Sequence, residues 1–146
     1  MIRYAKHEDA EWIVSLMEAN SDTITPFNLE VVKYEIDHKM YIVNVDDDTD
    51  VPCSLIRFVI TDDFIRILLA LTEEDCRQMG HSRLLYQYLF AKYQKPIRYL
   101  VESGSEIEKV WTERNDRVAK ATSRIKTFKS KDRDLTEYEA VYRGRK

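Results

Sequence analysis

Glycine, proline and cysteine are scarce in this 146-residue chain, with three, three and two residues respectively. No apolar run approaches the roughly 18 residues of a membrane-spanning helix, so no membrane partner is expected. The opening "MIRYAKHEDAEWIV" lacks a basic segment followed by an apolar core, which argues against a signal peptide. Cys53 and Cys76 form no CxxC pair and the three histidines are scattered, so the spacing predicts no metal site. These absences favour a cytoplasmic location.

The residues that are present indicate one globular domain. Hydrophobic residues make up 44% and charged residues 34% of the chain. No linker or repeat divides it, so we expect a single domain over residues 1–146. The acidic run at 46–50 lacks the glycine and the distant glutamate of a calcium loop, and we interpret it as a hairpin loop.

Hydrophobic periodicity predicts a mixed α/β (α+β) fold of about seven strands and four helices. Helices are expected at 8–20, at 26–39, around Leu84–Leu89 and at 105–115. Strands are expected at 1–5, 39–45, 53–61, 64–71, 95–102, 117–129 and 136–144, with the last two forming a hairpin. The fourth strand is almost continuously apolar, which is typical of a central strand covered on both faces.

Two helix starts carry recognisable signals. Asn28 is placed to accept a hydrogen bond from a first-turn N–H group, with Phe27 and Val32 at the positions of a hydrophobic staple. Ser105 and Glu108 have the spacing of a capping box at the start of the last helix.

Gly80 lies between the apolar strand at 64–71 and the helix after it, in the pattern R-x-x-G-x-S. The first turn of a helix leaves N–H groups without helical partners, and these favour anions such as phosphate. A missing or small side chain at Gly80 and Ser82 would let a ligand reach those groups, and Arg77 adds a forked cationic donor. The alternative is a plain turn.

The order of elements across residues 2–143 resembles the GCN5-related N-acetyltransferases, whose sheet is twisted and mostly antiparallel. Their signature [RQ]-x-x-G-x-[GA] is similar to "RQMGHS" at 77–82, with Ser82 as the departure. The resemblance implies acetyl-CoA as co-substrate, held at its pyrophosphate by the loop and along its pantetheine arm by the end of the strand. The implied binding residues are Leu71, Thr72, Arg77, Gln78, Met79, Gly80, His81 and Ser82.

Catalysis in that family needs a base and an acid. Glu73 lies where many members carry a base that drains the amine's proton, although Glu73 and Glu74 equally suit solvated acids favoured by a helix dipole. The position of the usual acidic tyrosine is occupied by Trp111, whose indole does not release its proton. Ser103 and Ser105 are nearby candidates for protonating the thiolate.

The leading hypothesis is acetyl transfer from acetyl-CoA to a primary amine of a small molecule or protein, by direct attack in a ternary complex. The alternative is a catalytically weakened binding or structural protein on the same fold, similar to short phage acetyltransferase-like proteins of the virion or host cytoplasm. Its expected protein-partner surface is the segment 117–133, which holds seven basic residues and one acidic residue. Nucleic acid is not the expected partner, because no binding motif accompanies this segment. A homodimer is left open.

Overall fold

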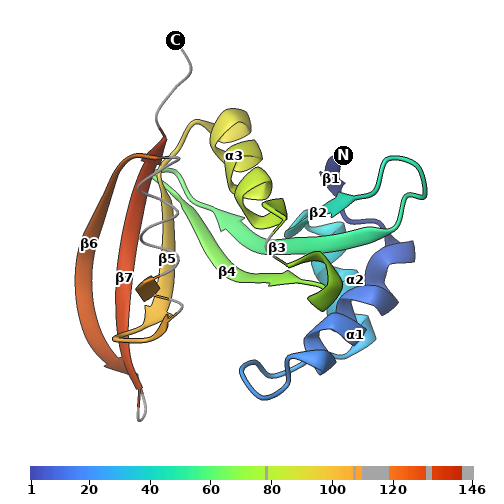
Figure 1. Ribbon diagram of the computed structural model, residues 1–146, viewed down its shortest axis with the longest axis horizontal. Helices are drawn as coiled ribbons and strands as arrows, with labels where there is room; N and C mark the ends of the chain where they lie inside the picture. Colours follow the sequence, from blue (N-terminus) through green and yellow to red (C-terminus); the bar gives the residue numbers. More distant parts are fainter. Residues whose placement is uncertain (78, 107, 110–118, 131–132, 143–146) are drawn as a thin grey trace. The chain divides into compact units, whose positions relative to one another are not determined.

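The computed structural model describes residues 1–77, 79–106, 108–109, 119–130 and 133–142. Its strands form a seven-stranded sheet in the order β1-β2-β3-β4-β5-β7-β6 (Figure 1). They are β1 (Ile2–Tyr4), β2 (Tyr41–Val45), β3 (Pro52–Ile60), β4 (Ile65–Thr72), β5 (Ile97–Glu102), β6 (Ala119–Ser130) and β7 (Arg133–Tyr142). β4 and β5 are parallel, whereas β1–β2, β2–β3, β5–β7 and β6–β7 are antiparallel. The predicted mixed, mostly antiparallel sheet is confirmed.

The helices are α1 (Ala10–Ala19), α2 (Leu29–Asp37) and α3 (His81–Tyr93), with short 3-10 helices η1 (His7–Asp9) and η2 (Glu74–Cys76). The fourth expected helix, at 105–115, falls mostly outside the described residues. Its cap is described: Ser105 Oγ accepts from the Glu108 N–H at 3.1 Å, as predicted. Within the described part of the chain, no helix is both long and apolar enough to cross a membrane.

The chain divides into two compact units. Unit 1 comprises residues 1–58 and 69–85, and unit 2 comprises residues 59–68 and 86–146. The chain passes from one unit to the other inside β3, inside β4 and inside α3, with no linker at any of these points. The single domain expected over residues 1–146 stays a prediction.

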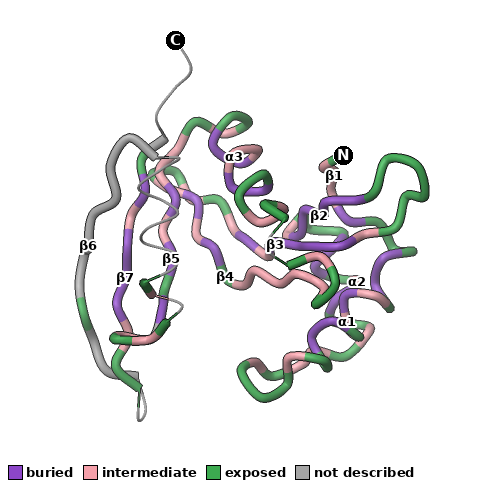
Figure 2. The backbone as a smooth tube through the Cα atoms, in the orientation of Figure 1, coloured by how far each residue is buried: buried purple, intermediate pink, exposed green. Residues whose placement is uncertain are grey.

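The core of unit 1 lies between α1, α2 and the strands β2 and β3. Ala10, Ile13 and Met17 recur at helical spacing on α1 and are at most 1% exposed, so one stripe of the helix faces this core. Figure 2 shows buried segments along α1 and at β2, whose five residues are all buried. The predicted cap of α2 is confirmed, because Asn28 Oδ1 accepts from the Val31 N–H at 2.9 Å. The staple residues Phe27 and Val32 belong to the same apolar cluster.

β4 differs from the sequence-based expectation. Ile65 and Ile67 are buried as predicted, but Leu68 is 39% exposed and the last four residues are only half-buried. Leu69 and Leu71 pack against the core of unit 1, and strand alternation puts Leu68 on the opposite face. The expectation that both faces of β4 are covered was therefore wrong for the second half of the strand. An apolar sequence does not guarantee that another element packs on each face.

Unit 2 contains the closing hairpin. Thr136, Tyr138 and Ala140 of β7 are buried, which confirms the predicted alternation on that strand. Glu137, expected on the wet face, is also buried (4% exposed), because its carboxylate binds Arg66 at 2.9 Å. The basic segment 117–133 includes β6, but its side chains lie outside the described part except at Thr127 and Arg133. Its partner role stays a prediction.

Candidate functional site

The loop between β4 and α3 contains the residues singled out by the sequence pattern. Gly80 has a φ of +81°, a left-handed conformation that side chains rarely tolerate. A Cβ placed there would meet nothing within 4 Å, so conformation rather than crowding requires the glycine. The Gly80 carbonyl accepts from the Leu84 N–H at 3.1 Å, which closes the first turn of α3. The glycine thus ends the loop and starts the helix.

The first turn of α3 carries no acidic residue, whereas the first turns of α1 and α2 carry Glu11 and Glu30. An acid at this position usually neutralises the positive end of a helix dipole. The first-turn side chains of α3 are instead neutral or basic, including the exposed Arg83. This helix end therefore keeps a positive potential that favours an anion.

The structure brings the described members of the predicted binding set together in unit 1. Arg77, Met79 and Gly80 are exposed, and the other described members are half-buried: Leu71, Thr72, His81 and Ser82. Gln78 lies outside the described residues. Arg77 Nε donates to the Thr72 carbonyl at 3.3 Å, which joins the loop to the end of β4. The loop and the end of β4 are thus joined by a hydrogen bond, and both are at least partly exposed.

Glu73 directly follows β4 and is half-buried. Its Oε1 accepts from Trp12 Nε1 of α1 at 2.6 Å, and its backbone N–H donates to the Cys53 carbonyl at 2.8 Å. The carboxylate is therefore held in one place, whereas Glu74 is exposed in the first turn of η2 and fits the description of a solvated acid. The sequence analysis missed Trp12, although the need of a half-buried indole for a polar partner was a usable signal.

A cavity of about 320 Å³ lies beside this pair in unit 1. Trp12 lines it, so the residue that holds Glu73 also faces the cavity. Charged side chains of both signs make up most of its remaining wall, which consists of Arg3, Lys6, Glu8, Asp9, Asp50, Val51 and Pro52. The cavity can admit a small polar group within reach of α1 and the start of β3.

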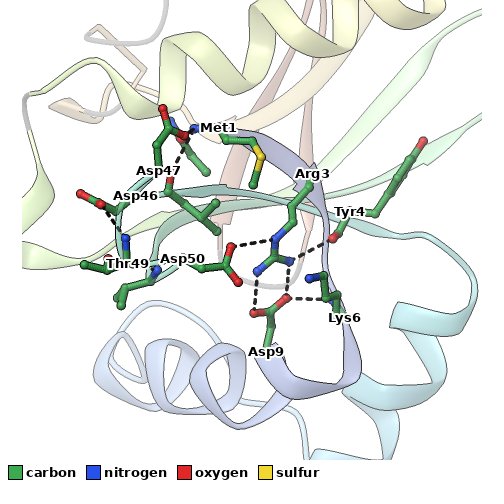
Figure 3. Close-up of polar contacts among 12 residues, drawn as sticks. Met1, Arg3, Tyr4, Lys6, Asp9, Asp46, Asp47, Thr49 and Asp50 are labelled. Carbon is green, nitrogen blue, oxygen red and sulfur yellow. Dashed lines mark hydrogen bonds and ion pairs between the residues drawn. The ribbon is translucent and has the colours of Figure 1, made fainter.

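The polar wall of the cavity is organised around Asp9 (Figure 3). Arg3 donates twice to its carboxylate, from Nη1 at 2.7 Å and from Nη2 at 3.2 Å, and the Lys6 backbone N–H donates at 2.8 Å. Burial alone would raise the pKa of Asp9, but the hydrogen bonds and positive charge from Arg3 and Lys6 outweigh it, so this pKa lies below its usual value. Asp9 is therefore firmly ionised.

Cys53, Cys76 and His81 come together in unit 1. Their ligand atoms all lie within 4.8 Å of one another, although the residues come from β3, η2 and α3. Burial, reinforced by Cys76, raises the pKa of Cys53 to about 11, so its thiol is neutral and a weak nucleophile. Sequence spacing concealed this cluster because the three residues do not form a local motif.

Among the described residues, no group is identified that would protonate a leaving thiolate. Trp111 lies outside them. Ser103 Oγ shares a 2.6 Å hydrogen bond with Thr136 Oγ1, and Ser105 Oγ caps a helix start, so both hydroxyls have structural partners in unit 2.

The sequence matches no protein-family model and no curated protein. The structure is similar to the ribosomal-protein-alanine N-acetyltransferase from Brucella melitensis, with a TM-score of 0.74 and 13% identity over 97% of this chain and 99% of that one. It is also similar to a chain of the NatC complex bound to Gag peptide and CoA (TM-score 0.72, 14% identity, 98% of each chain). A chain of the NatB acetyltransferase complex bound to CoA and MES gives a TM-score of 0.74 at 10% identity, covering 98% and 99%. The chain therefore has the fold of N-acetyltransferases.

Proposed function

We propose that this protein transfers an acetyl group from acetyl-CoA to an amine, as a member of the GCN5-related N-acetyltransferases. The observation that carries this proposal is the glycine-initiated start of α3, free of first-turn acids, on a chain with the fold of N-acetyltransferases. Two similar structures, the NatC and NatB complexes, have CoA bound.

The loop would hold the pyrophosphate of acetyl-CoA. N–H groups of the first turn of α3 and the guanidinium of Arg77 supply donors to its oxygens. Gly80 keeps side-chain atoms out of the approach, since nothing lies within 4 Å of the position a Cβ would take. The half-buried end of β4, at Leu71 and Thr72, would then lie along the pantetheine arm.

Glu73 would act as the base. The amine must be neutral for its nitrogen to attack the thioester carbonyl, so its extra proton has to leave. As the C–N bond forms and the C–S bond breaks, a proton passes to the carboxylate of Glu73, directly or through water, and the CoA thiolate takes up a proton from solvent or a nearby group. Trp12 holds Glu73 Oε1 at 2.6 Å, which leaves the second carboxylate oxygen for this role.

One observation favours the alternative, a catalytically weakened binding protein on the same fold. The Trp12–Glu73 hydrogen bond also links α1 to the end of β4, so Glu73 has a structural role that needs no chemistry. Such a protein would act through protein–protein contacts, with the segment 117–133 as its contact surface. This hypothesis includes a phage origin.

The test is thermal unfolding of the full chain with acetyl-CoA and with pantetheine, which lacks the pyrophosphate. At 100 times its dissociation constant, acetyl-CoA should stabilise the fold by about 2.7 kcal/mol. Pantetheine at the same concentration should give a much smaller shift, because the loop is expected to bind phosphate. No shift at millimolar acetyl-CoA would contradict the enzyme and leave the weakened binding protein.

Matched variants locate the site. Gly80 and Gly104 both have left-handed φ values, +81° and +77°, and open space around a Cβ. Replacing either by alanine should cost a similar free energy of unfolding, about 1–2 kcal/mol, but only Gly80→Ala should weaken acetyl-CoA binding. Arg77→Glu should abolish the shift that Arg133→Glu, at another exposed arginine, preserves. Equal loss of binding in both members of a pair would place the ligand elsewhere.

A further inference from the structure

Two thiols and an imidazole meet in unit 1 without any local sequence motif. Cys53 is buried in β3, Cys76 ends η2, and His81 is the first residue of α3; the last two are half-buried. Their ligand atoms lie within 4.8 Å of one another. Thiolate and imidazole together form the donor set preferred by zinc-class ions.

The spacing of the ligand atoms is compatible with a tetrahedral site. With Zn–S bonds of about 2.3 Å, two ligand sulfurs in a tetrahedron lie about 3.8 Å apart. The three side chains therefore need to approach by about an ångström or less, which rotamer adjustments and a small movement of the loop would supply.

Asn44 of β2 contacts two of the three ligand residues. Its carbonyl accepts from Cys53 Sγ at 3.4 Å, and its side-chain nitrogen lies 3.1 Å from His81 Nδ1. The amide NH2 of Asn44 can only donate, so in this arrangement His81 Nδ1 accepts and Nε2 carries the proton. Coordination through Nε2 therefore requires the Asn44 amide to turn over, so that its oxygen accepts from an Nδ1–H group, which is the usual way in which an outer partner orients a metal-binding histidine.

The charge of such a site would also be balanced. Two thiolates neutralise a divalent cation, so the half-buried site would carry no net charge and avoid the penalty for an unpaired ion. Loading converts two thiols to thiolates and releases two protons to solvent.

We propose that Cys53, Cys76 and His81 bind a zinc-class divalent ion, with a fourth position open to water or another ligand. Because Cys76 and His81 flank the loop at 77–80, the bound ion would tie that loop to β3. This site goes beyond the proposed acetyl transfer and does not depend on it, since no part of the test involves acetyl-CoA.

The test uses the reduced, metal-free full chain and Co²⁺ as a spectroscopic probe. One equivalent of Co²⁺ should produce sulfur-to-cobalt charge-transfer absorption and the strong visible bands of a tetrahedral ion, and Zn²⁺ should displace both. Cys76→Ser, at the half-buried cysteine, should lose the charge-transfer intensity even if Cys53→Ser fails to fold. His81→Ala should weaken Zn²⁺ binding by more than the roughly 10- to 100-fold that loss of an outer-shell partner costs.

His38→Ala is the matched control, because His38 also belongs to unit 1 but its Nδ1 bonds the Tyr34 carbonyl instead. It should bind both ions like the parent chain. The proposal is overturned if the parent shows no charge-transfer band, if the band survives in Cys76→Ser, or if His81→Ala binds Zn²⁺ as tightly as His38→Ala. It is also overturned if the two sulfurs form a disulfide and the reduced protein takes up no metal.

Discussion

At the scale of single residues, Asp9 shows how one carboxylate connects groups from neighbouring segments of the chain. It accepts two hydrogen bonds from Arg3 of β1 and one from the Lys6 backbone, so it fixes the path from the first strand into α1. The Asp9 and Arg3 side chains are only 8% and 14% exposed. The pair therefore lies between a surface ion pair and a buried one in the free energy that it contributes.

We expect Asp9→Asn to destabilise the fold by about 2 kcal/mol near neutral pH, between the values of surface and buried pairs. The folded-state pKa of Asp9 is depressed below its ordinary 3.8. Its contribution is thus fully present above that value and is lost as the pH falls through the lower folded-state pKa. In urea unfolding, the difference between the parent and Asp9→Asn should be constant above about pH 5 and shrink below about pH 4.

The exposed Asp22 supplies the control. Asp22→Asn should change the free energy of unfolding by no more than about 0.5 kcal/mol at each pH. A deficit in Asp9→Asn that stays constant down to the lowest pH would show that the variant loses packing rather than charge.

At the scale of elements, a buried carboxylate joins α2 to the sheet. Glu35 of α2 is 7% exposed, and its Oε1 accepts from the Tyr41 hydroxyl of β2 at 2.7 Å. Arg57 of β3 donates to both carboxylate oxygens, from Nε at 3.1 and 3.2 Å. Burial and the neighbouring Glu35 charge raise the pKa of Tyr41, so its hydroxyl stays a donor at all accessible pH values.

We expect Glu35→Ala to cost about 3 kcal/mol in the free energy of unfolding, because it leaves the Arg57 guanidinium partly buried without its counter-charge. Glu30→Ala, at an exposed glutamate of the same helix, should cost at most about 1 kcal/mol through the helix dipole. Chemical denaturation of both variants measures the difference. Equal costs would mean that Glu35 contributes only as a helix residue.

The elements themselves were largely predictable, because periodicity and caps are local. The strand at 41–45, the Asn28 cap and the alternation of β7 all follow from residues a few positions apart. Buried charges were not predictable in this way. Glu35 and Glu137 depend on Arg57 and Arg66, which are 22 and 71 residues away, so only the packing of α2 on the sheet and the arrangement of the strands bring the partners together.

The same distinction applies to the candidate site. A glycine loop before a helix start at α3 was expected from one short pattern, whereas the left-handed φ of Gly80 was not. The Trp12–Glu73 hydrogen bond joins residues 61 apart, and the Cys53–Cys76–His81 cluster joins β3 to the segment after β4. Sequence spacing gives no information about contacts between segments that are far apart in the chain. These arrangements therefore appear only in the structure.

At the scale of the whole molecule, the two units share secondary-structure elements. β3, β4 and α3 each begin in one unit and end in the other. Melting of either unit would therefore cut all three elements in the middle. The units are therefore not separable at a linker.

We expect a single cooperative unfolding transition. Far-ultraviolet circular dichroism and tryptophan fluorescence should give coincident curves in urea, because neither unit keeps complete strands without the other. In Trp111→Phe the remaining tryptophan is Trp12 of unit 1. The fluorescence transition of this variant should coincide with its circular dichroism transition as well. Two separated transitions would show that the units fold independently.

The position of β7 affects how the chain is made. This strand lies between β5 and β6 but follows both in the sequence, and it pairs with β5 from Ile97↔Ala140 to Glu102↔Leu135. During translation at about 5–20 residues per second, the 33 residues from Glu102 to Leu135 take about 2–7 s to add. Because β7 is made after both of its neighbours, β5 keeps an open edge until β7 has emerged and paired with it, and until then a neighbouring polypeptide can pair with that edge.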